Sequence, residues 1–319
     1  MRTLRVSVPK DLDGKTVKTV LKTCLLVSSA ELSRLKRKPD GIRLNGAHVY
    51  VNAPVSEGDL LETDISDIPE PGRTVPVRIP LDILYEDEDI LILNKPAGMT
   101  IHADSRRPEE ITLENAVIGY LGDGTVPHPV SRLDRGTSGA VTYAKNAWMH
   151  ARLKSLQHTD DFQRIYLGIV HGIPGNSTGT IDAPIGFAEG SVYQRAVCDS
   201  GAEAITRYKM ISADPERNLS LVELFPLTGR THQLRVHLAY IGNPLAGDWL
   251  YGTEERNLIE RPALHSWKIL FRHPLNKEQL KIECPIPEDL IRAYPDLGKE
   301  DQCMKENREE VCKTGSGWI

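Results

Sequence analysis

The sequence predicts an α+β protein, in which a mixed, mainly antiparallel sheet carries peripheral helices and follows a small αβ module. Many apolar segments are short, rich in β-branched residues and bounded by Gly, Pro or Asn, as at 89–93, 166–170 and 219–225. Helices are predicted between such segments, near 112–121, 147–158 and 231–240. The sheet and its helices form one large domain, and the first residues of the chain differ from it in charge.

The pattern divides the 319 residues into four parts. Residues 1–65 form the small module, and 66–75, rich in Pro and acidic residues, read as a linker. Residues 76–294 form the main domain. The polar stretch 295–319 lacks a clear apolar face, so we expect a flexible tail.

The small module has its own local signals. Residues 15–26 place Val17, Val20 and Leu21 on one helical face. Ser28 and Glu31 have the spacing of a capping box, which predicts a second helix over 30–38. Two short strands at 41–46 and 48–51 are expected around a turn at 45–46, where Asn-Gly favours a hairpin.

Composition narrows the class of protein. The net charge is −5, yet eleven Lys and Arg face four Asp and Glu between residues 1 and 45, which leaves the remainder at −12. A basic module on an acidic body is compatible with RNA binding. The five cysteines are scattered without a Cys-x-x-Cys pair, which favours free thiols in a reducing cytoplasm and neither a zinc site nor disulfides. The apolar runs stay well below the ~20 residues of a membrane span.

The run Ser-Arg-Leu-Asp-Arg-Gly-Thr-Ser-Gly at 131–139 is the strongest chemical signal. It places one carboxylate, Asp134, between Arg132 and Arg135 and leads into an apolar segment. Opposite charges within about 4–6 Å keep a carboxylate ionised, as a nucleophile or an electrostatic catalyst requires. A surface cluster of ion pairs is the alternative interpretation of the same spacing.

This run resembles the Arg-Leu-Asp-Arg-x-Thr-Ser-Gly signature of the RluA-type RNA pseudouridine synthases. Further segments resemble that family in the same order along the chain. They are Leu-Tyr-Glu-Asp-Glu-Asp-Ile-Leu-Ile-Leu-Asn-Lys-Pro-Ala-Gly-Met at 84–99, Arg-Ile-Tyr-Leu-Gly-Ile-Val-His-Gly at 164–172, Leu-Thr-Gly-Arg-Thr-His-Gln-Leu-Arg-Val-His at 227–237, and Gly-Asp-Trp-Leu-Tyr-Gly at 247–252. The chain departs from the family at Ser131, where His is common, and at Gly136, where an acidic residue or its amide is common.

The resemblance implies an isomerase that converts uridine to pseudouridine without a cofactor or metal. It implies that Asp134 acts on the sugar, as nucleophile or as base, and that Tyr166 lies against the uracil. It also implies that Arg230, at the start of a helix, pairs with Asp134. Leu264 and Ile286 correspond to apolar residues of the pocket, although ordinary core packing explains them equally well.

RNA is the expected partner of a monomeric protein, with ribosomal RNA as the expected class and tRNA as the alternative. The front module resembles an S4 RNA-binding domain, which implies RNA contacts by Arg34, Lys36, Arg37 and Lys38. Arg132 corresponds to the family side chain that fills the space left by the flipped base, and Arg135 is expected to bind RNA beside it. The competing hypotheses are an RNA-binding or ribosome-assembly protein that has lost catalysis, and a hydrolase that cuts free uridine.

Overall fold

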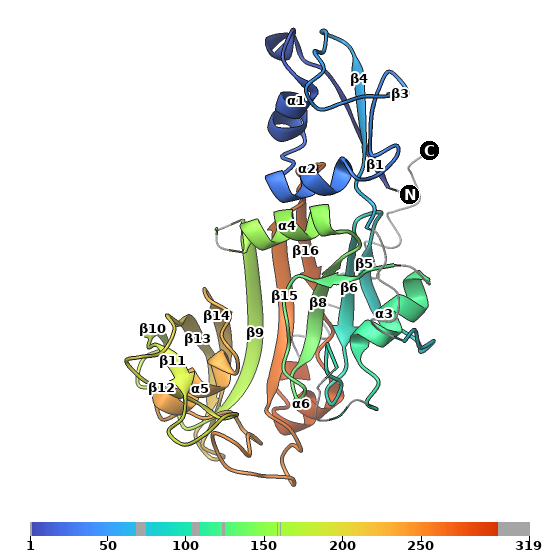
Figure 1. Ribbon diagram of the computed structural model, residues 1–319. Coiled ribbons are helices and arrows are strands. Elements are labelled where there is room, and N and C mark those ends of the chain that lie inside the picture. Colours follow the sequence, from blue (N-terminus) through green and yellow to red (C-terminus); the bar gives the residue numbers. More distant parts are fainter. Residues whose placement is uncertain are drawn as a thin grey trace.

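A ten-stranded mixed sheet forms the centre of the protein in this computed structural model, which describes residues 2–67, 75–103, 107, 109–122, 125–157, 159 and 161–298 (Figure 1). In sheet order the strands are β10 (Thr178–Asp182), β13 (Ile205–Asp214), β14 (Leu219–Pro226), β9 (Phe162–His171), β15 (Leu264–Arg272), β8 (Ser138–Ala144), β6 (Ile90–Lys95) and β5 (Ile83–Glu86). β16 (Gln279–Glu283) pairs with β15, and β7 (His128–Pro129) pairs with β8. Every pairing is antiparallel except β15 with β8, so the predicted mixed, mainly antiparallel sheet is confirmed.

Helices cover both faces of this sheet, and alternate residues of a strand enter different apolar cores. On β6, Ile90 and Ile92 pack with α4 (Ala147–Leu156), whereas Leu91 and Leu93 pack in the core that contains α3 (Leu113–Leu121) and α5 (Gln233–Tyr240). A third core contains α6 (Glu288–Ala293) and extends to Leu297. All seven residues of β8 are buried, as expected for a central strand covered on both faces.

The helix predictions for this domain hold with small shifts. α3 and α4 begin after Thr112 and Asn146, whose side chains accept hydrogen bonds from backbone N–H groups of the first turn. α5 begins at Gln233, two residues later than expected, because His232 has a left-handed backbone with φ of 57° and cannot continue a helix. The predicted tail lies mostly at 299–319, outside the described residues, but Leu297 is buried and belongs to the folded domain.

The N-terminal module is a four-stranded sheet, in the order β1 (Thr3–Ser7), β4 (Leu60–Asp64), β2 (Ile42–Leu44) and β3 (Ala47–His48), with α1 (Val17–Cys24) and α2 (Ser29–Leu35). A short 3-10 helix spans Lys10–Leu12. Both hydrogen bonds of the predicted capping box at Ser28 are present. Asn45 and Gly46 have φ of 53° and 83°, as in a two-residue hairpin turn. The strand expected at 48–51 is confined to its first residue, because β3 ends at His48.

The module packs directly on the main domain (Figure 1). One apolar core contains residues of α1, α2 and β4 together with Trp148 and Met149 of α4 and Phe271 of β15. Trp148 Nε1 donates to the carbonyl oxygen of Leu25 at 3.0 Å, and Arg152 Nη1 donates to Glu31 Oε1 at 2.8 Å. Most of the predicted linker, at 68–74, lies outside the described residues; before it, Asp67 contacts His128 and the N–H of Ala147 in the main domain.

Within the described part of the chain, no helix combines the length and apolar character needed to cross a membrane.

Candidate active site

A cleft of about 560 Å³ brings together residues from three motifs of the sequence. Its walls are the loop that precedes β8, one face of β9, the segment between β14 and α5, and the start of β15. The loop contributes Asp134, β9 contributes Tyr166 and the segment before α5 contributes Arg230. The three predicted catalytic residues therefore line one cavity although up to 96 positions separate them in the sequence.

Backbone contacts fix the loop that carries Asp134. The N–H of Thr137 donates to the carbonyl oxygen of Asp134 at 3.1 Å, and the N–H of Gly98 donates to that of Arg135 at 2.8 Å. Lys95 is fully buried, and its Nζ donates to the carbonyl oxygens of Pro96 and Met99 at 2.8 Å and to that of Arg135 at 3.4 Å. Burial, with the nearby charge of Arg261, lowers the pKa of Lys95 to about 7.

The cation beside Asp134 is Arg235, which corrects the expected pairing with Arg230. Arg235 Nη1 lies 4.0 Å from Asp134 Oδ2, and the Asp134 side chain is 28% exposed. Arg230 lies before α5 and not within it, and its Nε donates to the carbonyl oxygen of Glu203 at 2.8 Å. Among the described residues, no ion pair joins Arg230 to Asp134. Arg235 occupies the first turn of α5, which points it into the molecule.

Asp248 holds Arg235 in this position. Nε and Nη2 of Arg235 each donate to a different oxygen of Asp248 at 2.7 Å, and Asp248 is fully buried. Burial opposes the charge of Arg235, but the hydrogen bonds to Asp248 and the charges of Asp248 and Asp134 raise its pKa. The guanidinium is therefore a permanent cation between two carboxylates. A charged residue between Leu234 and Val236 in an apolar helical stretch was the sequence signal for this buried role.

Tyr166 is more deeply buried than the half-buried strand position expected from the sequence. It is 6% exposed on β9 and packs in the same apolar core as Leu234 and Leu264, which also line the cleft. Burial raises the pKa of Tyr166, opposed by the charge of Arg164 and by a hydrogen bond with Ser266. Its hydroxyl therefore keeps its proton at neutral pH. Ile286 packs in the separate core around α6 and does not line the cleft, so only Leu264 of the two predicted apolar residues does.

Cations surround the mouth of the cleft. Arg132 is exposed, and Lys154 and Arg164 line the cleft with it. Burial and the charges of Arg164 and Arg132 lower the pKa of Lys154, so the three groups act on one another. Arg135 instead forms an ion pair with Glu110. Sequence analysis missed Lys154 and Arg164 because only the tertiary fold brings these residues of α4 and β9 to one cleft.

The two departures from the family signature are accommodated by packing. Ser131 is buried in the cleft wall. A Cβ atom at Gly136 would lie 3.0 Å from Cδ of Pro262, and Arg261 Nη1 donates to the carbonyl oxygen of Gly136 at 3.1 Å. The backbone at this position is thus tied to the segment that precedes β15, and a longer side chain would require that segment to shift.

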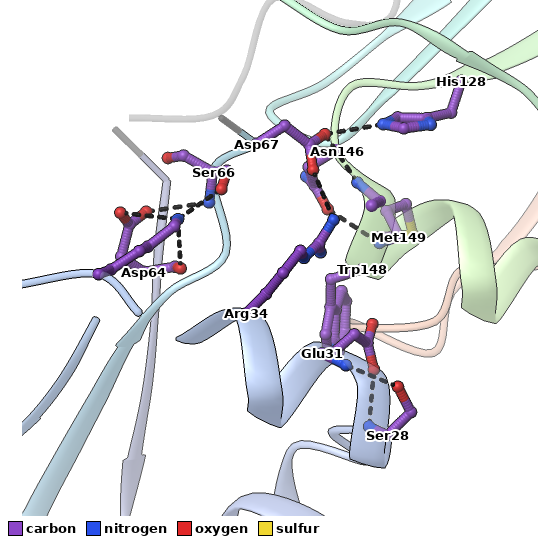
Figure 2. A network of polar contacts seen from close by, with 12 residues as sticks. Ser28, Glu31, Arg34, Asp64, Ser66, Asp67, His128, Asn146, Trp148 and Met149 are labelled. Carbon is purple, nitrogen blue, oxygen red and sulfur yellow. Dashed lines mark hydrogen bonds and ion pairs between the residues drawn. The ribbon is translucent and has the colours of Figure 1, made fainter. Parts of the chain in front are cut away.

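Two of the four basic residues predicted on the N-terminal module are engaged within the protein (Figure 2). Arg34 Nη1 forms an ion pair with Asp67 at 3.2 Å, and Asp67 also accepts a hydrogen bond from the N–H of Ala147. Lys38 Nζ contacts the carboxylate of Asp64 at 3.0 Å. Lys36 and Arg37 are exposed. The four basic residues predicted on the module therefore comprise two exposed cations and two that hold the segment leading into the main domain.

Comparison with known proteins identifies the family. A protein-family model described as RNA pseudouridylate synthase matches residues 89–240. The chain is 37% identical over 269 residues to the uncharacterized RNA pseudouridine synthase YjbO of Bacillus subtilis, covering 83% of this chain and 94% of YjbO. It is 33% identical over 310 residues to ribosomal large subunit pseudouridine synthase D of Zymomonas mobilis, covering 91% of this chain and 96% of that protein.

A solved structure agrees with this relationship. Human RNA pseudouridylate synthase domain containing 1 matches with a TM-score of 0.53 at 26% identity, over 65% of this chain and 84% of that chain. The chain belongs to the RNA pseudouridine synthase family, as an isomerase of the RluA type.

Proposed function

We propose that this protein isomerises specific uridines of ribosomal RNA to pseudouridine, with Asp134 as the catalytic carboxylate. The observation that carries the proposal is the cleft in which Asp134, held beside Arg235, faces the same cavity as the buried Tyr166. Two relatives that match over most of this chain bear the name ribosomal large subunit pseudouridine synthase D, which favours ribosomal RNA over tRNA.

The reaction breaks the bond between N1 and C1′, turns the base, and forms a bond between C5 and C1′. The base leaves C1′ with the electron pair of the broken bond. Asp134 acts on the sugar, either by attack on C1′ or by removal of a sugar proton, and both routes require an ionised carboxylate. After C5 is bonded, its proton is lost and N1 gains one, so substrate and product are isomers. Tyr166 supports the uracil as a neutral phenol, so as the proposed acceptor of the C5 proton it must pass its own hydroxyl proton on to the base or to solvent in the same step.

The target base must leave its stack to enter the cleft, which costs a few kcal/mol. Arg132, exposed at the mouth two residues before Asp134, is suited to fill the vacated space, because a guanidinium stacks on bases and binds phosphate. Lys154 and Arg164 are suited to hold the flanking phosphates. Lys36 and Arg37 of the N-terminal module extend the proposed RNA contact. The proposed enzyme is a monomer and acts in the cytoplasm, where ribosomes are assembled.

A tritium-release experiment tests the proposal. RNA labelled at C5 of uridine is prepared from cells that lack the gene and is incubated with wild-type protein or with Asp134→Asn. We expect tritium release by wild type only. The uridines that wild type converts should map to ribosomal RNA. The catalytic assignment fails if Asp134→Asn releases tritium at the wild-type rate. An RNA-binding protein without catalysis is indicated if wild type binds this RNA but releases none.

A further inference from the structure

His232 has a strained backbone at the cleft. Its φ of 57° and ψ of 18° lie in the left-handed region, which costs free energy for a residue other than glycine. Four other non-glycine residues in the described part of the chain have positive φ, and His232 is the one of the five that lines the cleft. Such strain persists where the surrounding structure holds it, and it is concentrated at functional sites.

The ring of His232 is held through one nitrogen. Its Nδ1 lies 2.8 Å from the hydroxyl oxygen of Tyr251, and that oxygen accepts a hydrogen bond from the N–H of Arg195 at 3.0 Å. Because the backbone N–H already donates to this oxygen, the tyrosine proton is available for Nδ1. A neutral ring that accepts at Nδ1 carries its own proton at Nε2.

Burial keeps the ring of His232 neutral, and charges from several elements modify this effect. Asp134 and Asp248 favour its protonation, Arg235 and Arg195 oppose it, and burial is the largest influence. Together they lower the pKa of His232. The uncharged rings of Tyr193 and Tyr251 pack edge-on against it, with centroids 5.7 and 5.6 Å away.

Tyr251 joins His232 to the group that holds the catalytic carboxylate. The guanidinium of Arg235 lies 5.0 Å from the centroid of the Tyr251 ring, and the N–H of Tyr251 donates to Asp248 at 3.2 Å. His232 and Arg235 are therefore positioned by one rigid cluster. A ring placed this way needs no reorganisation when charge develops beside it.

We propose that His232 contacts the substrate and donates its Nε2–H to a carbonyl oxygen of the target uracil. This inference rests on the proposed function. When the bond to C1′ breaks, the base carries the electron pair as negative charge delocalised onto its carbonyl oxygens. A fixed neutral donor stabilises that charge and retains the detached base while it turns. The exposed cations at the mouth suit phosphates, whereas a buried neutral donor beside Asp134 suits the uncharged base.

Two substitutions separate hydrogen bonding from backbone strain. The amide of His232→Gln can place an N–H near the position of Nε2, and the shorter amide of His232→Asn cannot. Asn tolerates the left-handed backbone better than Gln, so strain alone predicts that His232→Asn is the more stable and more active of the two variants. We expect kcat of His232→Asn to fall by on the order of a hundredfold, with KM little changed and with partial recovery in His232→Gln.

Tritium-release kinetics of these two variants can overturn the inference. It is overturned if His232→Asn keeps kcat within twofold of wild type, or if it is more active than His232→Gln. A rise in KM with unchanged kcat would mark a phosphate contact in place of the uracil contact. Absence of tritium release by wild type would refute the proposed function instead, so the two failures are distinguishable.

A spectroscopic measurement checks the proton independently of activity. In the full-length protein labelled with 15N-histidine, we expect the His232 signals, assigned with His232→Asn, to show a neutral ring protonated at Nε2. Tyr251→Phe removes the hydroxyl and keeps the ring, so the two tautomers should then mix. A wild-type ring protonated at Nδ1, or at both nitrogens at neutral pH, would refute the proposed donor.

Discussion

At the scale of single residues, the proposed catalytic carboxylate Asp134 depends on a second carboxylate, Asp248, that lies outside the cleft. Asp248 is fully buried and takes two hydrogen bonds from Arg235, whose remaining Nη1 faces Asp134 at 4.0 Å. An arginine keeps its charge, so without a partner in a site this buried it would move toward water. Asp248 prevents this movement, so the field at Asp134 is set by a residue 114 positions away in the chain.

The roles of Arg235 and Arg230 can be separated by substitution. We expect Arg235→Ala to lower the free energy of unfolding by roughly 3–5 kcal/mol, because it leaves Asp248 buried and unpaired. Arg230→Ala, at an exposed side chain bonded to a backbone carbonyl, should change it by about 0.5 kcal/mol or less. Urea unfolding of both variants measures the difference. Equal stability of the two variants would contradict the pairing seen in the cleft.

At the scale of elements, close contact between β15 and β8 places the Asp134 loop against the rest of the site. Gly139 pairs in parallel with Ser266, and a Cβ atom at Gly139 would lie 2.3 Å from the carbonyl oxygen of Ser266. Its φ of 110° also excludes most other residues. The Ser-Gly that closes the 131–139 run thus allows β8 to start beside β15. The turn between β5 and β6 has a comparable anchor in Asp87.

Asp87 should make stability depend on pH. Although burial opposes its charge, the close contact with His273 and hydrogen bonds from Tyr85 and two backbone N–H groups depress the pKa of its carboxyl well below the ordinary value. A depressed carboxyl pKa stabilises the fold above the unfolded pKa of about 4, and this stabilisation is lost as pH falls toward the folded pKa.

We therefore expect the melting temperature of wild type to fall more steeply than that of Asp87→Asn between about pH 5 and 3. The wild-type advantage at pH 7 should be roughly 1–3 kcal/mol. Thermal melts across this range test it. Parallel curves for the two proteins would show that Asp87 does not carry the acid sensitivity.

At the scale of the whole molecule, the N-terminal module is part of the same packed structure as the cleft. Arg152 of α4 reaches Glu31 of α2, and Arg2 reaches Asp89 of the main domain with Nη2 to Oδ2 of 2.7 Å. These contacts fix the orientation of the module relative to the cleft. A fixed arrangement favours recognition of the shape of the RNA, rather than binding by two parts that move independently.

Because of these contacts, removal of residues 1–72 should destabilise the main domain as well as weaken RNA binding. The truncation exposes Trp148 and Met149 and leaves Arg152 without Glu31. We expect a melting temperature at least several degrees lower, measured beside the full chain. If the truncated protein melts at the wild-type temperature, the shared core contributes little to the fold.

The RNA role of the module is tested more cleanly by its exposed cations. Replacing Lys36 and Arg37 with Ala should weaken RNA binding and reduce the slope of log affinity against log salt by roughly 2. Arg34→Ala is the matched comparison, because its ion pair with Asp67 predicts a loss of stability in place of a loss of slope. An unchanged salt slope in the double variant would remove Lys36 and Arg37 from the proposed RNA contact.

The sequence by itself determined the local structure and predicted residues that line the cleft. Capping at Ser28, the turn at Asn45 and the helix after Asn146 depend on neighbouring residues only, so short-range patterns predict them. Asp134 and Tyr166 lie in motifs whose resemblance to the family implies their roles before any contact is known.

The tertiary structure decided which side chains meet. Arg235 and Arg230 belong to the same motif, and the start of α5 at Gln233, together with buried Asp248, decides which of them reaches Asp134. In the same way, Asp64 and Asp67 engage Lys38 and Arg34 and leave Lys36 exposed. These outcomes depend on pairings between residues far apart in the chain, whose free energy comes from burial and geometry that a local pattern does not contain.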